Sequence, residues 1–117
     1  MFTVSTPLSL DSSTNFSRIN TVTGGIVTGP MQKTAQAQKM VDVYKRIVKE
    51  EFGGEVSEWV AGGLTDGNRT AKFVPTLDAL GVENYDEHTD HESVDLNTAV
   101  PRTAAFALTL AELAEVF

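Results

Sequence analysis

The sequence predicts an α+β protein in which helix dominates, and three observations lead to this class. Residues 30–52 and 101–117 each carry apolar residues at helical spacing. The segments between them offer only short runs typical of hairpins and turns. A chain of 117 residues is long enough for one small core, so we expect a single helix-rich domain at 30–117, preceded by an arm at 1–29.

The arm at 1–29 is rich in serine and threonine, and Asp11 and Arg18 are its only charged residues. Its apolar residues follow no helical period, which predicts extended chain. Gly24-Gly25 suits the mirror-image turns of hairpins, so the runs at 18–22 and 26–28 are expected to pair. An isolated hairpin is marginal in water. The arm is therefore expected either to fray or to lie on this core or a neighbouring subunit.

The first predicted helix covers about residues 30–52. Pro30 suits the first helical position, and Thr28 or Gly29 can provide the cap. Gly53-Gly54 predicts the end of the helix, because glycine readily adopts the left-handed conformation found there. The apolar stripe comprises Ala37, Met40, Val41, Val43, Tyr44, Ile47, Val48 and Phe52.

The middle of the chain carries weaker signals. Residues 55–63 resemble one or two helical turns that end at Gly62-Gly63. A turn at Asp66-Gly67 is expected to lead into a short strand at 70–74, and a short helix is expected at 75–80. Residues 82–100 are long and polar, which predicts an acidic loop with little regular structure.

The second predicted helix covers about residues 101–117, with Pro101 at its start. Alanines at 104, 107, 111 and 114 would allow a partner helix to approach closely. Alternation of apolar residues over 105–111 also fits a strand, but alanine and leucine favour helix. Because the segment is too apolar to stand alone, we expect it in the core or at an interface. Its apolar seam comprises Phe106, Leu110, Leu113 and Phe117.

One group of residues could bind a metal ion. His88 and His91 lie three residues apart, with Asp90 and Glu92 beside them, and two imidazoles with carboxylates suffice to hold zinc. The order fits neither the metal-hydrolase motif nor a calcium-binding EF-hand loop. A solvated acidic loop is therefore the preferred interpretation, and no cofactor is predicted.

Other catalytic signatures are missing from the sequence. Without cysteine there can be no disulfide, thiolate zinc site or cysteine nucleophile. Neither a serine-nucleophile motif nor a phosphate-binding P-loop occurs. We therefore expect a protein that is not an enzyme, with a small His/carboxylate metalloenzyme as the residual possibility.

Charge and hydropathy limit the partners and the location. The formal net charge of −7 disfavours nucleic acid as a partner. The sequence shows no signal peptide and no apolar run long enough for a membrane span, so a cytoplasmic or virion location is expected. Residues 33–49 carry five bases and one acid, whereas residues 83–95 carry six acids and no base.

These features predict a structural or assembly subunit of a larger complex, such as a virion component, whose partners are copies of itself or other subunits. Complementary charge would set the register of assembly, and apolar surface would supply burial. The alternative is a small acidic inhibitor or adaptor that binds a basic partner through residues 83–95. The expected interface comprises Phe106, Leu110, Leu113, Phe117, Lys39, Arg46, Lys49, Glu83, Asp86 and Glu87.

Overall fold

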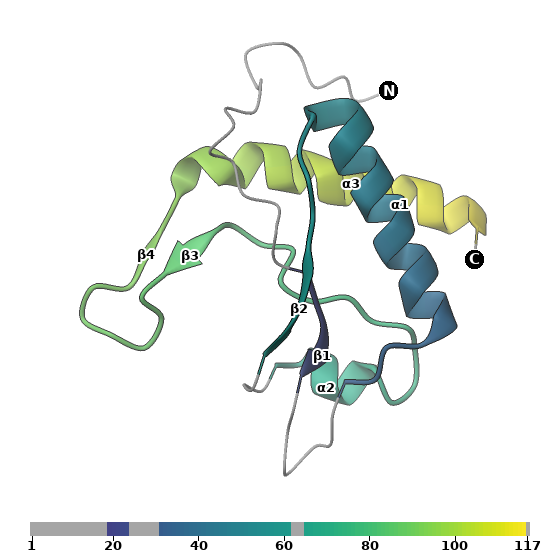
Figure 1. The fold of residues 1–117 in the computed structure, drawn as a ribbon, viewed down its shortest axis with the longest axis horizontal. Helices are drawn as coiled ribbons and strands as arrows, with labels where there is room; N and C mark the ends of the chain where they lie inside the picture. Colours follow the sequence, from purple (N-terminus) through teal and green to yellow (C-terminus); the bar gives the residue numbers. More distant parts are fainter. Residues whose placement is uncertain (1–18, 24–30, 62–64, 117) are drawn as a thin grey trace.

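Two long helices dominate the computed structural model, which describes residues 19–23, 31–61 and 65–116 (Figure 1). The predicted α+β class with two main helices is confirmed, and the strand predicted as an alternative at 105–111 is not formed. In chain order the elements are β1 (Ile19–Thr23), α1 (Ala35–Phe52), β2 (Glu58–Ala61), α2 (Gly67–Thr70), β3 (Asn84–Tyr85), β4 (Ser93–Val94), the 3₁₀ helix η2 (Leu96–Thr98) and α3 (Ala99–Val116).

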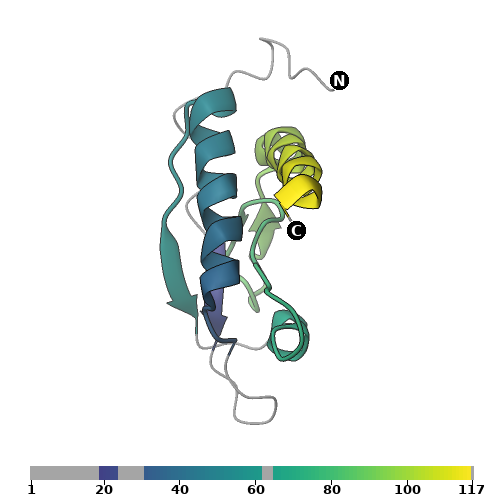
Figure 2. The ribbon, with the colours of Figure 1, turned by 90° about the vertical axis from the view of Figure 1, so that its right-hand side faces the viewer.

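The described elements form a thin body. The helices α1 and α3 cross each other, and β2 lies on the side of α1 away from α3 (Figure 2). The shortest extent is 19 Å, close to two helix diameters of about 10–12 Å each. Among the described elements, α1 lies on one side of α3 and none lies on the opposite side (Figure 2).

Helix α1 begins at Ala35, five residues later than predicted, because Thr34 provides its cap. The Thr34 hydroxyl oxygen accepts a hydrogen bond from the Ala37 amide at 3.0 Å, which satisfies a donor that the helix leaves unpaired. The predicted end is confirmed: Gly53 adopts a left-handed conformation with φ of 66°, and its amide donates to the Lys49 carbonyl.

The core lies between α1 and α3. Six of the eight residues of the predicted α1 stripe are buried, and Met40 and Val43 are half-buried. From α3 only small side chains, Ala104 and Ala105, are fully buried in the main cluster, with Leu108 packed against it. The buried members of that cluster are Val41, Tyr44, Ile47, Val48, Phe52, Ala104 and Ala105.

β1 has a strand partner that the sequence did not predict, and the hairpin partner predicted at 26–28 lies outside the described residues. β1 pairs in parallel with β2, with Ile19 opposite Glu58 and Thr23 opposite Ala61. A parallel pair needs a long crossover connection, and the segment containing α1 supplies it. The helical turns predicted at 55–63 are therefore wrong, because the β-forming residues there find a strand partner far away in sequence. Residues 1–18 and 24–30, which make up the rest of the predicted arm, lie outside the described residues.

Residues 65–80 also differ from the prediction. The strand expected at 70–74 is replaced by α2 and the turns that follow it. Local side-chain hydrogen bonds favour this turn: the Asn68 carboxamide oxygen accepts from the Thr65 amide, and the Thr65 hydroxyl accepts from the Gly67 amide. The helix expected at 75–80 does not form either, and Ala79 adopts a left-handed φ of 64°.

The acidic segment has more structure than predicted. β3 and β4 form an antiparallel hairpin whose tip spans residues 86–92. The amide of Asp95 donates to the Glu83 carbonyl at 2.9 Å, which extends the pairing toward the base of the hairpin. The Asp95 carboxylate then accepts from the Asn97 amide, caps η2 and starts the helical run that continues into α3.

Candidate functional site

The side of α3 turned away from α1 carries large apolar side chains that remain accessible to solvent. Val100 is 50% exposed, Phe106 42% and Leu110 52%. In Figure 2, which looks nearly along α3, α1 lies on one side of this helix and no described element lies on the other. We call the exposed residues of this side the outer face of α3: Val100, Thr103, Phe106, Ala107, Leu110, Ala111 and Ala114.

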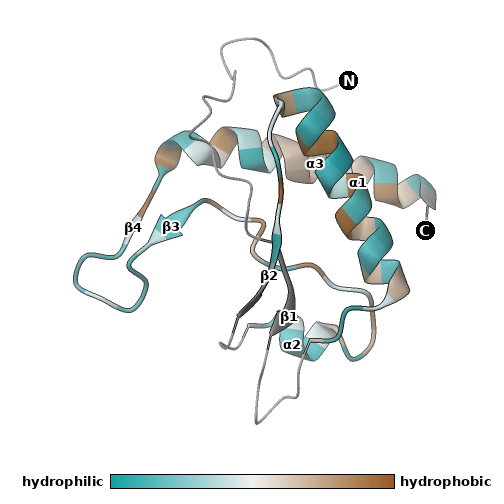
Figure 3. Ribbon diagram, viewed as in Figure 1, coloured by the Kyte–Doolittle hydropathy of each residue, from teal (hydrophilic) through white to brown (hydrophobic). Residues whose placement is uncertain are grey.

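The inner side of α3 combines the small apolar residues Ala104 and Ala105 with two buried polar residues. Arg102 and Thr109 are each only 2% exposed, and the Thr109 hydroxyl donates to the Ala105 carbonyl at 2.7 Å. Most surface helices turn apolar side chains inward and polar ones outward. Here Arg102 and Thr109 are buried, whereas Phe106 and Leu110 are 42% and 52% exposed. Hydrophobic residues recur along much of α3 (Figure 3).

Arg102 fixes the position of α3 relative to the preceding loop. Its guanidinium donates to the carbonyl oxygens of Ala79, at 2.8 Å, and of Gly81, and pairs with the Glu83 carboxylate at 3.4 Å. The Glu83 amide donates to the Thr98 hydroxyl at 3.0 Å. These bonds connect residues 79–83 to the start of α3 and hold that end of the outer face in place.

The predicted seam of 101–117 is only partly on the outer face. Phe106 and Leu110 are exposed as an interface requires, whereas Leu113 is half-buried and Phe117 lies outside the described residues. The prediction missed Val100 and Thr103. Both could have been found by extending the three- and four-residue spacing backward from Ala107 along the helix.

The basic residues of α1 do not form a free positive surface. Lys45 pairs with Glu58 at 2.9 Å, and Lys33 pairs with the same carboxylate. Arg46 pairs with Glu112 of α3 and with Glu50 at 3.2 Å. Of the predicted interface cations, Lys39 and Lys49 are exposed, but the acids Asp42 and Glu50 share their exposed side of the helix.

The ion pairs around α1 shift two pKa values. Hydrogen bonds from Lys33 and Lys45 lower the pKa of Glu58 below its usual 4.5. The hydrogen bond to Glu112 raises the pKa of Arg46. Both shifts stabilise charged forms that tie α1 to β2 and to α3, which is a structural role.

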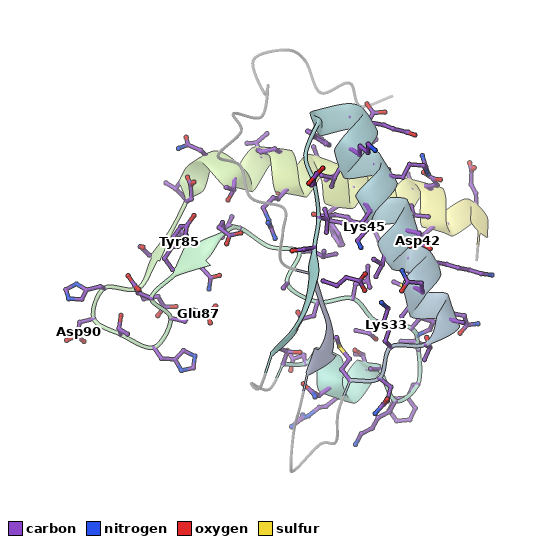
Figure 4. The ribbon with its side chains drawn as sticks, in the orientation of Figure 1. Lys33, Asp42, Lys45, Tyr85, Glu87 and Asp90 are labelled. Carbon is purple, nitrogen blue, oxygen red and sulfur yellow. The ribbon has the colours of Figure 1, made fainter. Side chains whose placement is uncertain are left out.

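The acidic hairpin is separate from these cations. Glu87 and Asp90 project from the tip, on the opposite side of the molecule from Lys33 and Lys45 (Figure 4). Asp86, Glu87, Asp90 and Glu92 are exposed, and none of them pairs with a cation of the described residues. Glu83 is different: it is buried against Arg102, so its assignment to the interface is corrected to a structural position.

The predicted metal ligands lie on the tip of this hairpin. His88, Asp90, His91 and Glu92 are all exposed, and His88 adopts a left-handed φ of 67°. Within residues 19–23, 31–61 and 65–116, no group of three or more His, Asp or Glu side chains is placed to hold a metal ion. The structure therefore does not bring the four predicted ligands together.

No protein-family model, curated protein or solved structure matches the chain. Among the helices that the structure describes, none is both long and apolar enough to cross a membrane. On the described surface, the outer face of α3 and the acidic hairpin are the two distinctive features.

Proposed function

We propose that this protein is a non-enzymatic structural or assembly subunit, held in a multi-subunit complex through the outer face of α3. The observation that carries the proposal is the outward position of Phe106 and Leu110 on a helix whose inner side holds Arg102 and Thr109. Apolar surface of this kind on a small protein is typical of a protein–protein interface.

Burial of the outer face favours association for two reasons. Full burial of a large apolar side chain contributes about 1.5–3 kcal/mol, so completing the burial of three half-exposed ones contributes about 1 kcal/mol each. The face also contains no charged residue, so a partner can cover it without burying a charge. A particle such as a virion, built from many small subunits, is a setting in which such a face would be used.

Light scattering of the purified chain at several protein and salt concentrations tests the proposal. We expect a mass above the 12.6 kDa of one chain at high protein concentration, with little dependence on salt, because apolar burial is not screened by ions. The double variant Phe106→Gln/Leu110→Gln should remain folded and become monomeric.

The matched control is Phe73→Gln. Phe73 is 86% exposed but lies in the turn after α2, outside the outer face of α3, so its substitution should leave the mass unchanged. A wild-type chain that stays at one-chain mass at every protein and salt concentration would contradict the proposal. If Phe73→Gln lost association to the same extent as the double variant, the apolar interface would not be confined to the outer face of α3.

A second candidate function, an acidic inhibitor or adaptor, is favoured by the hairpin tip. Its four exposed carboxylates pair with no cation in the described part of the chain. A lysine-rich peptide, titrated by calorimetry at 50 and 300 mM salt, is a suitable probe. Strong salt-sensitive binding that disappears in Asp86→Asn/Glu87→Gln/Asp90→Asn/Glu92→Gln would support this function, and equal binding by the variant would exclude it.

A further inference from the structure

The outer face of α3 contains a regular seam. Val100, Thr103, Ala107, Leu110 and Ala114 are all exposed and follow one another at intervals of three, four, three and four residues. This is the spacing at which one helix packs along another in a coiled-coil pair. Phe106 and Ala111 flank the seam on the same face.

We propose that the partner of this seam is the same seam of a second copy of the chain, packed antiparallel around a two-fold axis at Ala107. The inference rests on the proposed function and adds the identity and orientation of the partner. A two-fold contact of this kind is isologous, so each copy presents the same residues to the other.

Side-chain volume favours the antiparallel order. With Ala107 on the axis, Val100 faces Ala114 of the other copy, and Leu110 faces Thr103. Each of these two layers joins a larger side chain to a smaller one, so neither leaves a void or a clash. In a parallel pair Ala114 would meet Ala114 and Thr103 would meet Thr103, so those two layers would be underfilled.

Charge favours the same order. Two chains of net charge −7 repel each other, but the seam brings no charged side chain into contact. The nearest exposed acid is Glu115, one residue beyond Ala114. An antiparallel pair separates the two Glu115 side chains by most of the helix length of about 27 Å, whereas a parallel pair would place them side by side. The antiparallel order also places the positive N-terminal end of each helix dipole beside the negative C-terminal end of the other, which is favourable.

The size of the contact predicts a reversible dimer. A stable interface buries about 800 Å² on each partner, and one helix pair of this length falls short of that area. We therefore expect dimers that form at high protein concentration and separate on dilution. Larger assemblies would need further contacts.

Single cysteines test the arrangement cleanly, because the natural chain contains none. Under mild oxidation Ala107→Cys should cross-link to itself, since its two copies meet at the axis. Val100→Cys and Ala114→Cys should each cross-link poorly alone and well when mixed, because a disulfide requires Cα atoms about 4.4–6.8 Å apart. Gln36→Cys, exposed in the first turn of α1, controls for random collision.

The outcomes separate this inference from the proposed function. Self-cross-linking of Ala114→Cys at the level of Ala107→Cys would indicate parallel packing and overturn the antiparallel pair. Association in light scattering without any cross-link from the α3 cysteines would also overturn the pair while leaving the assembly function standing. A monomer at every concentration would overturn both.

Discussion

At the scale of single residues, buried polar groups are what position α3. The side chains of Arg102 and Glu83 are 3% and 2% exposed. Removing either one would leave the opposite charge buried without this partner, which would lower the stability of the fold strongly. Arg102 also donates hydrogen bonds to the backbone carbonyls of Ala79 and Gly81 in the loop before α3. The geometry of the outer face therefore depends on a residue that is not part of it.

Replacing Arg102 should destabilise the fold strongly. Arg102→Met leaves Glu83 buried without this cation, and we expect the free energy of unfolding to fall by about 3–5 kcal/mol in urea denaturation. The double variant Arg102→Met/Glu83→Leu should recover part of the loss, because no buried charge remains. Arg69→Met, at an exposed position of α2, should change stability by less than about 0.5 kcal/mol. A loss no larger in Arg102→Met than in this control would contradict the assigned role.

Tyr44 is the second residue with a testable polar group. Its hydroxyl is buried and has no hydrogen-bond partner in the described part of the chain, and burial raises the pKa of its phenol above 10.0, although Arg102 opposes this. The unfolded chain therefore loses this proton first, so stability is lost as pH rises above about 10. Tyr44→Phe should be as stable as wild type or more stable at pH 7, and should lose less stability between pH 9 and 11.

Tyr85→Phe is the control for this pH dependence, since Tyr85 is 46% exposed on the hairpin. Denaturation midpoints measured at both pH values compare the three proteins. If Tyr44→Phe loses stability above pH 10 as steeply as the wild type, ionisation of the buried Tyr44 phenol is not the cause of the loss of stability at high pH.

At the scale of elements, the end of α1 depends on backbone conformation more than on packing. Gly53 and Gly81 both have open space where a Cβ atom would lie, but only Gly53 has a positive φ, of 66°. Gly53→Ala should therefore destabilise the protein by about 1 kcal/mol, through strain in the left-handed cap. Gly81→Ala should be neutral or stabilising by up to about 1 kcal/mol. Thermal unfolding of the two variants measures the difference, and equal effects would show that the cap conformation is not limiting.

At the scale of the whole molecule, no element of residues 19–23, 31–61 and 65–116 covers the outer face of α3 (Figure 2), so stability should be coupled to association. If the dimer is the stable folded form, a tenfold rise in protein concentration should stabilise it by about 1.4 kcal/mol. The unfolding midpoint of the wild type should therefore rise with concentration, and that of Leu110→Gln should not. A midpoint independent of concentration in the wild type would mean that folding and association are separate.

The features of this protein that depend on local chemistry could be predicted from its residues alone. Helical spacing of apolar residues located α1 and α3. The end of α1 at Gly53 was predictable because glycine adopts the left-handed conformation at little cost. The apolar character of residues 101–117 predicted a role in the core or at an interface. Sequence patterns gave the wrong structure at two places. At residues 55–63 pairing with the distant strand β1 outweighed the helical pattern. At residues 70–74 hydrogen bonds from side chains favoured a turn over the expected strand.

Which groups meet across the fold could be learned only from the folded chain. It paired Lys33 and Lys45 with Glu58, paired Arg102 with Glu83, and left the hairpin acids without a cation among the described residues. It also turned Phe106 and Leu110 outward while burying Arg102 and Thr109. These outcomes depend on contacts between residues far apart in sequence, and a helix that is apolar on both sides does not reveal from its pattern which side the core will cover.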